Sequence, residues 1–286
     1  MPDVLYASCH VLPEPDPDEQ PTLDALRHEG LSAGVRGWDD PDATWDDARV
    51  VLPRATWTYP WALVAYEGWL DRVAAGGATL LNPPEVIRWN LHKRYLLQLA
   101  SEGIPTTPTP VVERGERVAL STIMASHRWE DVVVKPAVSA GSFRTLRVRS
   151  ENLGEGEEHL ASLLVERDVL VQPYLRSVQT YGERALVWID GELCHAVRKN
   201  PRFQGEDENV STEAMPISDA EARVAEEALE VVRGLGDLLY ARIDMAPGPD
   251  GRPMIMELEL IEPSLFFPQN PAAAARFARA VARRLA

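Results

Sequence analysis

The sequence predicts a mixed α/β protein made of three successive parts. Over residues 1–82, β-favouring runs alternate with helical segments, which is the pattern of a parallel α/β unit. Residues 111–176 combine short strands with one helix, and two long hairpins follow residue 182. The length of 286 residues agrees with two or three domains, because a domain usually has roughly 150 residues.

In the first part, apolar runs and turn residues define the elements. The predicted strands and helices are residues 4–8, 22–28, 31–35, 49–52, 61–75 and 79–81. A further helix is predicted over residues 84–103, since its apolar residues recur near helical spacing and Gly103 is a stop signal. The Pro/Thr-rich stretch 104–110 is then a hinge between domains.

The other two parts are predicted to hold short strands, two hairpins and three helices. The expected strands of the middle part are residues 132–135, 145–148 and 169–172, around a helix at 157–165. The expected elements of the third part are strands 184–189, 193–198, 240–245 and 254–260 and helices 219–235 and 271–285. Asp190 and Gly191 suit a tight hairpin turn in which both residues take a positive φ.

The composition excludes several classes of protein. The 29 basic and 44 acidic residues leave a net charge of −15, which repels phosphate backbones and anionic lipid, so we expect no nucleic-acid and no membrane partner. Cys9 and Cys194 form no metal-binding pattern, and no apolar run approaches the roughly 20 residues of a membrane span. The first residues lack the features of a signal peptide, so a cytoplasmic protein is expected.

Three carboxylates are expected to converge on the second hairpin of the third part. Glu257 and Glu259 are two residues apart in one predicted strand, so they face the same side, and Asp244 lies across the hairpin. Such a set suits Mg²⁺ or Mn²⁺, which prefer hard oxygen ligands. The alternative is an amphipathic strand whose acidic face points to water. Arg242 shares this side and is a candidate either to neutralise an anionic ligand or to pair with the carboxylates.

A candidate phosphate site follows the strand that ends at Lys135. The loop 138–145, VSAGSFRT, offers backbone N–H groups and hydroxyls of the kind that cradle phosphate oxygens. A plain surface hairpin with a solvated lysine explains the same residues. Lys93 is predicted to lie on a helix, where a solvated helix face is its simplest explanation.

A further group of charges is predicted at one end of the first hairpin. Antiparallel pairing would bring Glu183 and Arg184 beside Arg198 and Lys199, either around a site or as surface ion pairs. The sequence has no Walker A, G-x-G-x-x-G, G-x-S-x-G or H-E-x-x-H motif, which argues against P-loop, dinucleotide-binding, α/β-hydrolase and zinc-protease functions.

Together, these motifs resemble the ATP-grasp superfamily of ATP-dependent carboxylate–amine ligases, in its glutathione-synthetase-like and RimK-like branch. The motifs that carry the resemblance are WNLHKRYL at 89–96, VVKP at 133–136, VQPYL at 171–175, GER at 182–184, HAVRK at 195–199 and the set Arg242, Asp244, Glu257 and Glu259. The resemblance implies a Rossmann-like pre-ATP-grasp domain with a linking helix at 1–103. It also implies a lid subdomain at 104–176 and a C-terminal antiparallel-sheet subdomain with the metal site at 177–286.

The resemblance assigns nucleotide-binding roles to the matching positions. Lys93 and Lys135 match the lysines that contact the nucleotide phosphates, and the loop 139–145 matches the one that closes over the triphosphate. Residues 172–175 match the segment that reads adenine through its backbone. The full expected nucleotide set is Lys93, Lys135, Ser139, Gly141, Ser142, Gln172, Pro173, Tyr174, Leu175, Glu183 and Lys199.

The implied metal and catalytic positions lie mostly in the third part. Asp244 and Glu257 match the two magnesium carboxylates, while Glu259 occupies a position that is commonly Asn in this superfamily. Glu262 is a candidate to share the task of Glu259. The expected catalytic residues are Arg242, Lys135 and Arg198, and the expected cofactors are ATP and Mg²⁺ or Mn²⁺.

Three strings are similar, within the superfamily, to the actinobacterial group that contains O-ureido-D-serine cyclo-ligase. They are RATWTY at 54–59, GER at 182–184 and ELELIEP at 257–263. On this resemblance, Arg54 would hold a substrate carboxylate, and Trp57 and Tyr59 would wall its pocket. A core-capping aromatic cluster is the other explanation of these residues.

The expected function is an ATP- and Mg²⁺-dependent ligase that forms an amide-type C–N bond on a small amino-acid-like carboxylate, through an acyl phosphate. The amine belongs either to a second substrate or to the same molecule, as in the ring closure that forms D-cycloserine. Two alternatives are an ATP-grasp kinase or phosphotransferase and a non-catalytic nucleotide-binding sensor. The loops 139–145 and 203–211 are expected to order over the site, and homodimers are common among such relatives.

Overall fold

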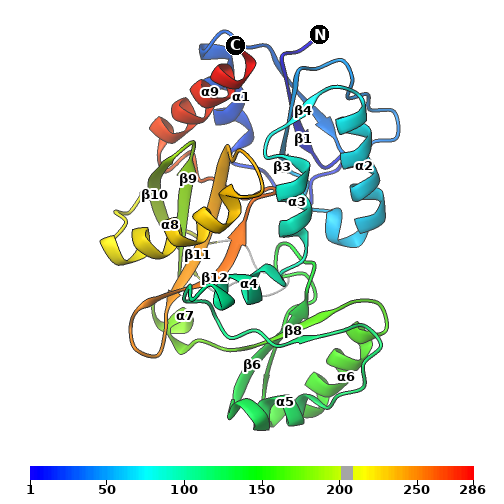
Figure 1. Ribbon diagram of the computed structural model, residues 1–286, viewed down its shortest axis with the longest axis vertical. Helices are drawn as coiled ribbons and strands as arrows, with labels where there is room; N and C mark the ends of the chain where they lie inside the picture. Colours follow the sequence, from blue (N-terminus) through cyan, green and yellow to red (C-terminus); the bar gives the residue numbers. More distant parts are fainter. Residues whose placement is uncertain (201–208) are drawn as a thin grey trace.

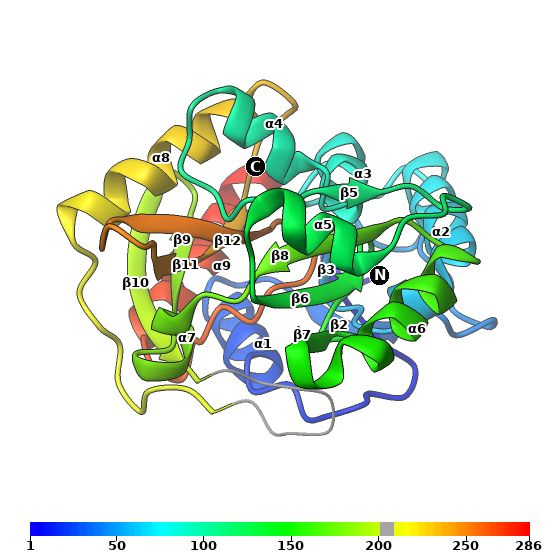
Figure 2. The ribbon, with the colours of Figure 1, turned by 90° about the horizontal axis from the view of Figure 1, so that it is seen from below.

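The computed structural model describes residues 1–200 and 209–286, and it contains three four-stranded sheets. Each sheet falls within one of the three parts predicted from the sequence, which confirms the mixed α/β class (Figure 1). Seen from below, the middle sheet with α5 and α6 lies in front of the other two (Figure 2). None of the helices in the described ranges is long and apolar enough to cross a membrane.

The first sheet is parallel and has the strand order β2-β1-β3-β4. Its central strands β1 and β3 are buried throughout, as expected for a parallel sheet covered on both faces. Trp69 of α2 is fully buried and forms edge contacts with Trp38 and Trp45, so an aromatic cluster fills one side. The elements of this part are β1 (Val4–Ser8), α1 (Glu19–His28), β2 (Ala33–Gly37), β3 (Val50–Ala55), α2 (Leu63–Ala75), β4 (Thr79–Leu80), α3 (Pro84–Leu91) and α4 (Tyr95–Ser101).

The middle sheet is antiparallel, with the order β5-β8-β6-β7, and α5 and α6 supply its core. Buried and half-buried residues alternate along β6, so one face packs on the helices and the other is free to face the third sheet. Its elements are β5 (Val111–Val112), α5 (Leu120–His127), β6 (Asp131–Pro136), β7 (Leu146–Arg149), α6 (Leu153–Leu164) and β8 (Val169–Pro173).

The third sheet is antiparallel, with the order β10-β9-β11-β12. Alternate residues of β9 enter two different cores: Leu186 and Trp188 pack with α8, while Val187 and Ile189 pack with α9. Its elements are α7 (Arg176–Thr180), β9 (Glu183–Ile189), β10 (Glu192–Lys199), α8 (Asp219–Arg233), β11 (Tyr240–Pro247), β12 (Pro253–Glu259) and α9 (Pro271–Leu285). Asp190 and Gly191 both have positive φ, as predicted for the hairpin turn.

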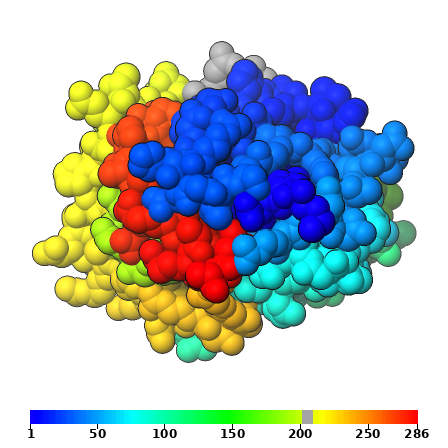
Figure 3. Space-filling view, turned by 90° about the horizontal axis from the view of Figure 1, so that it is seen from above, coloured from blue at the N-terminus to red at the C-terminus, as the bar shows by residue number. Residues whose placement is uncertain are grey.

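The first and third parts share a core. The C-terminal helix α9 packs on α1, and the two lie side by side at the surface in Figure 3. The buried side chain of Asn82 donates to the carbonyls of Tyr240 and Leu260, and its oxygen accepts from the Leu239 N–H. These bonds join the end of the first sheet to the third, so the two sheets hold a fixed relation.

The structure corrects the prediction of one helix over residues 84–103. The segment forms two short helices, α3 and α4, separated by an extended His92. The Lys93 N–H donates to the carbonyl of Ala137 (2.8 Å), a bond that a continuous helix would not allow. Lys93 therefore lies between two helices rather than on one. Helix α5 and the short strand β5 were also absent from the prediction, because neither has a strong periodic pattern.

Candidate active site

Two cavities meet where the three parts come together. The first lies between the middle and third sheets, and its wall includes Lys135, Gln172, Glu183 and Lys199. The second lies between the first part and the third sheet, and its wall includes Trp57. The walls of both cavities contain Ser139, Ala140, Gly141, Arg242, Glu257 and Glu259. These shared residues define the junction of the two cavities.

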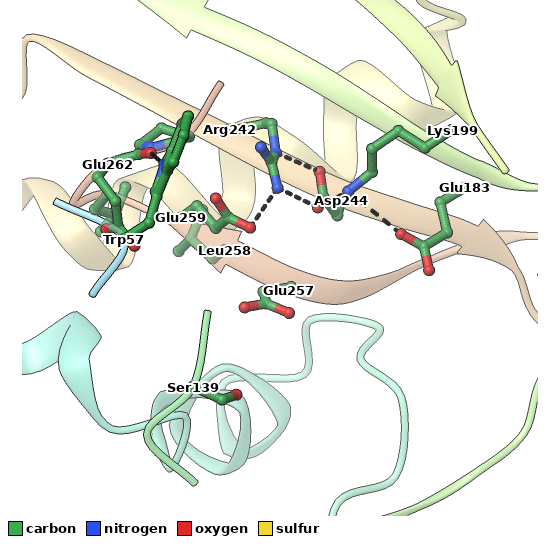
Figure 4. Close-up of polar contacts among 12 residues, drawn as sticks. Trp57, Ser139, Glu183, Lys199, Arg242, Asp244, Glu257, Leu258, Glu259 and Glu262 are labelled. Atoms are coloured by element: carbon green, nitrogen blue, oxygen red, sulfur yellow. Dashed lines mark hydrogen bonds and ion pairs between the residues drawn. The ribbon is translucent and has the colours of Figure 1, made fainter. Parts of the chain in front are cut away.

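The predicted carboxylate face of the second hairpin is present. Asp244 pairs with Glu257 across β11 and β12, and Arg242 pairs with Glu259, so all four side chains share one face (Figure 4). Strand β12 is an edge strand, and Asn90 satisfies its free edge: the amide donates to the Leu258 carbonyl and accepts from the Leu260 N–H, each at 2.8 Å. This edge pairing fixes the direction of the two glutamates.

Basic side chains pair with these carboxylates. Arg242 donates two bonds of 2.9 Å to Asp244 and also contacts Glu259. Lys199 Nζ lies 2.5 Å from Asp244 and 3.4 Å from Glu183. The result is a continuous row of alternating charges along the wall of the first cavity (Figure 4).

The two other predicted phosphate lysines flank Glu257. Lys93 Nζ lies 2.6 Å from one carboxylate oxygen, and Lys135 Nζ lies 3.9 Å from the other. Lys93 also donates to the Ser139 carbonyl at 2.7 Å, which ties it to the Gly/Ser loop. The structure thus brings together residues 93, 135 and 257, which are far apart in the sequence.

The chain contains three lysines in all, and each lies in this site. Lys93 and Lys199 are only 5% and 8% exposed. Elsewhere the chain uses arginine for its surface cations. Lysine is a compact charge that contacts phosphate oxygens as a point donor. The rarity of lysine in the sequence was therefore a signal for the site. It would have favoured a place in the site for Lys93 over a place on a solvated helix face.

Carboxyl groups outnumber basic groups in the walls of the two cavities. The acidic residues are Glu14, Glu183, Asp244, Glu257, Glu259 and Glu262, against the basic residues Lys93, Lys135, Lys199 and Arg242. Burial opposes ionisation of Asp244 and Glu257, but their basic neighbours outweigh it and lower both pKa values. Burial and the neighbouring carboxylates raise the pKa of Glu259 to about 7 and that of Glu262 to about 8.

The donor set of a cation site is present, but the carboxylates are not gathered around one point. Among residues 1–200 and 209–286, no three acidic, cysteine or histidine side chains cluster closely enough to hold a metal ion. Asp244, Glu257 and Glu259 each contact a basic group instead. Burial, together with the Asp244 and Glu257 carboxylates, raises the pKa of Glu259 and favours its protonated form in the ligand-free site. The three carboxylates suit a hard cation chemically, and their role as ligands stays a prediction.

The predicted adenine segment, 172–175, lies in the wall of the first cavity at the end of β8. The Gln172 amide donates to the Thr109 hydroxyl at 2.8 Å, and the Tyr174 N–H donates to the Asp131 carbonyl. The Gln172 side chain is therefore already engaged, and the recognition of adenine by backbone groups of 172–175 stays a prediction.

The Gly/Ser loop crosses the junction of the two cavities. Ser139, Gly141 and Ser142 all lie in the wall of the first cavity, and their contact with a nucleotide stays a prediction. Beyond them, the Phe143 ring packs on Trp61 of the first part, with centroids 4.6 Å apart. The loop is thus in contact with the first part. The second predicted closing loop, 203–211, falls largely outside the described residues.

The structure places two predicted residues away from the cavities. Arg54 is 1% exposed and lines neither cavity; it donates to the Pro263 carbonyl at 2.7 Å and stacks over Tyr240. The prediction ended the strand at residue 52, but β3 continues to Ala55 and turns Arg54 into the core. Arg198 is exposed and stacks on Tyr181, because strand alternation points it away from the face of Lys199.

The second cavity contains the predicted aromatic residues and adds others. Trp57 and Tyr59 lie in its wall, together with Trp61, Pro13, Glu14 and Glu262. Pro13 and Glu14 come from the loop before α1, which the buried carboxylate of Asp18 anchors to the backbone at 265–267. The sequence offered no signal for Asp18 beyond its acidity, since its partners are backbone groups about 250 residues away.

Comparison with known proteins decides the family. The cycloserine biosynthesis protein DcsG of Streptomyces lavendulae is 32% identical to the chain, and the match covers 94% of each. This chain belongs to the DcsG family of ATP-grasp ligases. A model of the N-terminal domain of the D-cycloserine synthetase DcsG matches residues 4–82. The crystal structure of D-cycloserine synthetase DcsG superposes with a TM-score of 0.91, at 32% identity over 99% of both chains.

More distant structures share the ATP-grasp fold. The D-alanine–D-alanine ligase from Bacillus anthracis is 15% identical, with a TM-score of 0.70 over 100% of this chain and 97% of that chain. Membership of the DcsG family makes the chain an ATP-dependent carbon–nitrogen ligase, and it confirms the predicted ATP-grasp fold.

Proposed function

We propose that the chain closes a ring within one small amino-acid-like molecule, converting O-ureido-D-serine to D-cycloserine at the expense of ATP. The observation that carries this proposal is the junction of two cavities at Arg242, Glu257 and Glu259. One cavity suits a nucleotide and the other a small polar substrate. The 32% identity to the DcsG protein of Streptomyces lavendulae supports the choice of substrate.

ATP would occupy the first cavity. Backbone groups of 172–175 would meet the base, and the Gly/Ser loop would lie over the phosphates together with Lys93 and Lys135. These charges would compensate the negative charge that grows on the transferring phosphoryl group. The ion pairs of Lys93 and Lys135 with Glu257 hold both amines at the junction.

Asp244 and Glu257 would hold Mg²⁺, with Glu259 as a third oxygen donor in the position usually taken by Asn. When bound, the metal supplies charge neutralisation for the phosphates. The chain's own residues do the rest. Lys199 and Arg242 neutralise the charge of Asp244 in the ligand-free site. Once a cation took over this neutralisation, both basic side chains could turn toward phosphate oxygens.

The chemistry proceeds in two bond-forming steps. The substrate carboxylate attacks the γ-phosphate, which gives an acyl phosphate and ADP. The nitrogen bonded to the side-chain oxygen then attacks the acyl carbon and expels phosphate, which closes the ring. One water removes the carbamoyl group as carbon dioxide and ammonia. Water must be kept from the acyl phosphate, and the contact of Phe143 with Trp61 supports the proposal that the loop closes over the junction.

The experiment is an assay of Mg²⁺-dependent ADP release with O-ureido-D-serine and with pooled amino-acid-like carboxylates. We expect release with O-ureido-D-serine, and a heavy-oxygen label in its carboxylate should appear in the phosphate. One of the two carboxylate oxygens stays in the ring carbonyl, so the label in phosphate is diagnostic, and ADP release without labelled phosphate would favour the kinase alternative. ATP binding without ADP release in any pool would favour the sensor. A cytoplasmic location and a homodimer stay predictions.

Glu257→Gln tests the metal site. The variant keeps the shape of the side chain and removes one negative ligand, so we expect the Mg²⁺ concentration for half-maximal activity to rise about tenfold or more. A magnesium titration of ADP release measures this. Exposed Glu102→Gln is the matched control, and an unchanged magnesium requirement in Glu257→Gln would remove that residue from the site.

A further inference from the structure

Glu262 is a buried carboxylate in the wall of the second cavity. The residue is 7% exposed and lies three residues after the end of the strand that carries Glu257 and Glu259. Figure 4 shows it beside Trp57, at the opposite end of the charged row from Lys199 and Glu183. It therefore lies on the substrate side of the junction.

Glu262 differs in its contacts from the acidic residues of β9, β11 and β12 that line the first cavity. Glu183, Asp244, Glu257 and Glu259 each form an ion pair with a lysine or an arginine. No residue in the described ranges donates a hydrogen bond to the Glu262 carboxylate or forms an ion pair with it, although Lys93 and Arg242 act on it at longer range. A buried carboxylate without such a partner is costly, so its place in a cavity wall indicates a ligand.

The surroundings of Glu262 suit a small organic cation. The Trp57 indole N–H donates to the Glu262 backbone carbonyl at 3.3 Å, which holds the indole against this residue. Tyr59 lies in the same wall and is 4% exposed. Aromatic faces beside a carboxylate attract ammonium groups through cation–π and charge-assisted contacts. A hydrated metal ion would find fewer oxygen donors here than at Asp244 and Glu257.

We infer that Glu262 is the subsite for the substrate's protonated primary amine, which is the α-ammonium group of an amino acid. The inference rests on the proposed function and names the group that selects amino acids over simple carboxylic acids. With the ammonium at Glu262, the substrate carboxylate can reach toward Arg242 and Lys93 at the junction of the two cavities.

The protonation state of the ligand-free site agrees with this role. Burial raises the pKa of Glu262 to about 8, and the Glu259 and Glu257 carboxylates add to the shift. A cation beside Glu262 would restore its ordinary ionised state. Neither Glu259 nor Glu257 could bind the ammonium group in place of Glu262, because both are already paired with basic groups.

The test compares D-cycloserine with isoxazolidin-3-one, which is the same ring without the amino group. Binding of each is measured by calorimetry in the presence of Mg²⁺ and a non-hydrolysable ATP analogue. We expect the wild-type protein to prefer D-cycloserine about tenfold or more, the ratio given by one charge-assisted hydrogen bond. Glu262→Gln should reduce that preference to less than about threefold, and Glu262→Asp should retain part of it. Glu102→Gln should keep the full preference.

Three outcomes separate this inference from the proposed function. If the wild type turns over O-ureido-D-serine but Glu262→Gln keeps the full preference for the amino compound, the subsite is wrong and the function stands. If the wild type shows no preference, the subsite is also wrong. If ADP is released only with another amino acid, the proposed substrate is wrong. The ratio of the affinities for that amino acid and for its deaminated analogue is then measured in wild type and in Glu262→Gln, and this ratio decides the subsite.

Discussion

Lys135 is the residue on which phosphoryl transfer should depend most. Burial lowers its pKa, and Glu257 holds its amine at 3.9 Å in the junction. Lys135→Ala should reduce kcat/KM for ADP release by about a hundredfold or more, the usual cost of removing one preorganised charge donor. The fold should persist, since Glu257 keeps its 2.6 Å contact with Lys93.

The control for that variant is exposed Arg117→Ala, because the chain has no lysine outside the site. Circular dichroism and the unfolding temperature would show that Lys135→Ala is folded. Near wild-type turnover in a folded Lys135→Ala protein would contradict the assignment.

Glu262 should make stability depend on pH in the ligand-free protein. Its pKa is about 8 when folded, against an ordinary value of 4.5. Between pH 4.5 and pH 8, Glu262 holds a proton in the folded state and has released it in the unfolded state. The stabilisation of the folded state by this proton is therefore complete below pH 4.5. Stability is lost as the pH rises toward 8, at about 1.4 kcal/mol per pH unit.

Glu262→Gln should remove the contribution of Glu262 to this slope, leave that of Glu259, and make the protein more stable than wild type near pH 8. Urea unfolding at several pH values, without nucleotide or metal, measures the difference between the two proteins. Equal slopes for wild type and variant would show that Glu262 has an ordinary pKa.

Residue types and their order predicted most of the site, but not which way single side chains point. Lys135, Asp244 and Glu257 were predicted from strand alternation and motif, and they lie together. Arg54 and Arg198 match the same motifs but point elsewhere. Arg54 turns inward because β3 is longer than its apolar run, and Arg198 alternates with Lys199. The orientation of Arg198 follows from strand alternation once Lys199 is placed in the site, whereas that of Arg54 depends on where β3 ends.

At the level of elements, the loop before α1 depends on one buried carboxylate. Asp18 accepts from the backbone N–H groups of Leu265, Phe266 and Phe267, and Arg54 lies 3.9 Å away. Asp18→Ala should lower the free energy of unfolding by about 3 kcal/mol or more, because it leaves these donors and the buried guanidinium without their acceptor. Thermal or chemical unfolding would measure the loss.

Asp24→Ala is the matched control, since Asp24 is an exposed residue of α1 that pairs with Arg27. We expect it to change stability by about 0.5 kcal/mol or less. The two variants remove the same group from positions six residues apart, so equal effects would show that the Asp18 contacts contribute little.

The elements themselves were predicted where local pattern decides them. The strands of the first sheet, the turn at Asp190-Gly191 and the helix α9 follow from apolar runs, turn residues and helical periodicity. The helix over 84–103 was wrong because a tertiary bond, from the Lys93 N–H to Ala137, interrupts it. Local periodicity carries no information about a partner 44 residues away.

At the scale of the whole molecule, the junction of two cavities is the feature that the sequence could not predict. It arises because Asn82 and Asn90 fix the first part to the third sheet, while the Gly/Ser loop of the middle part reaches both. Nucleotide and substrate would then meet at Arg242 and Glu257. Each contact joins segments from different parts of the chain.

The central claim is that these cavities hold ATP and one amino acid that is closed into a ring. The most direct measurement is mass spectrometry of the product formed from O-ureido-D-serine, ATP and Mg²⁺, with ADP quantified in the same sample. The account predicts D-cycloserine and ADP in equal amounts, with neither formed when Mg²⁺ or ATP is omitted. ADP accompanied by a phosphorylated open-chain product, and no D-cycloserine, would contradict it.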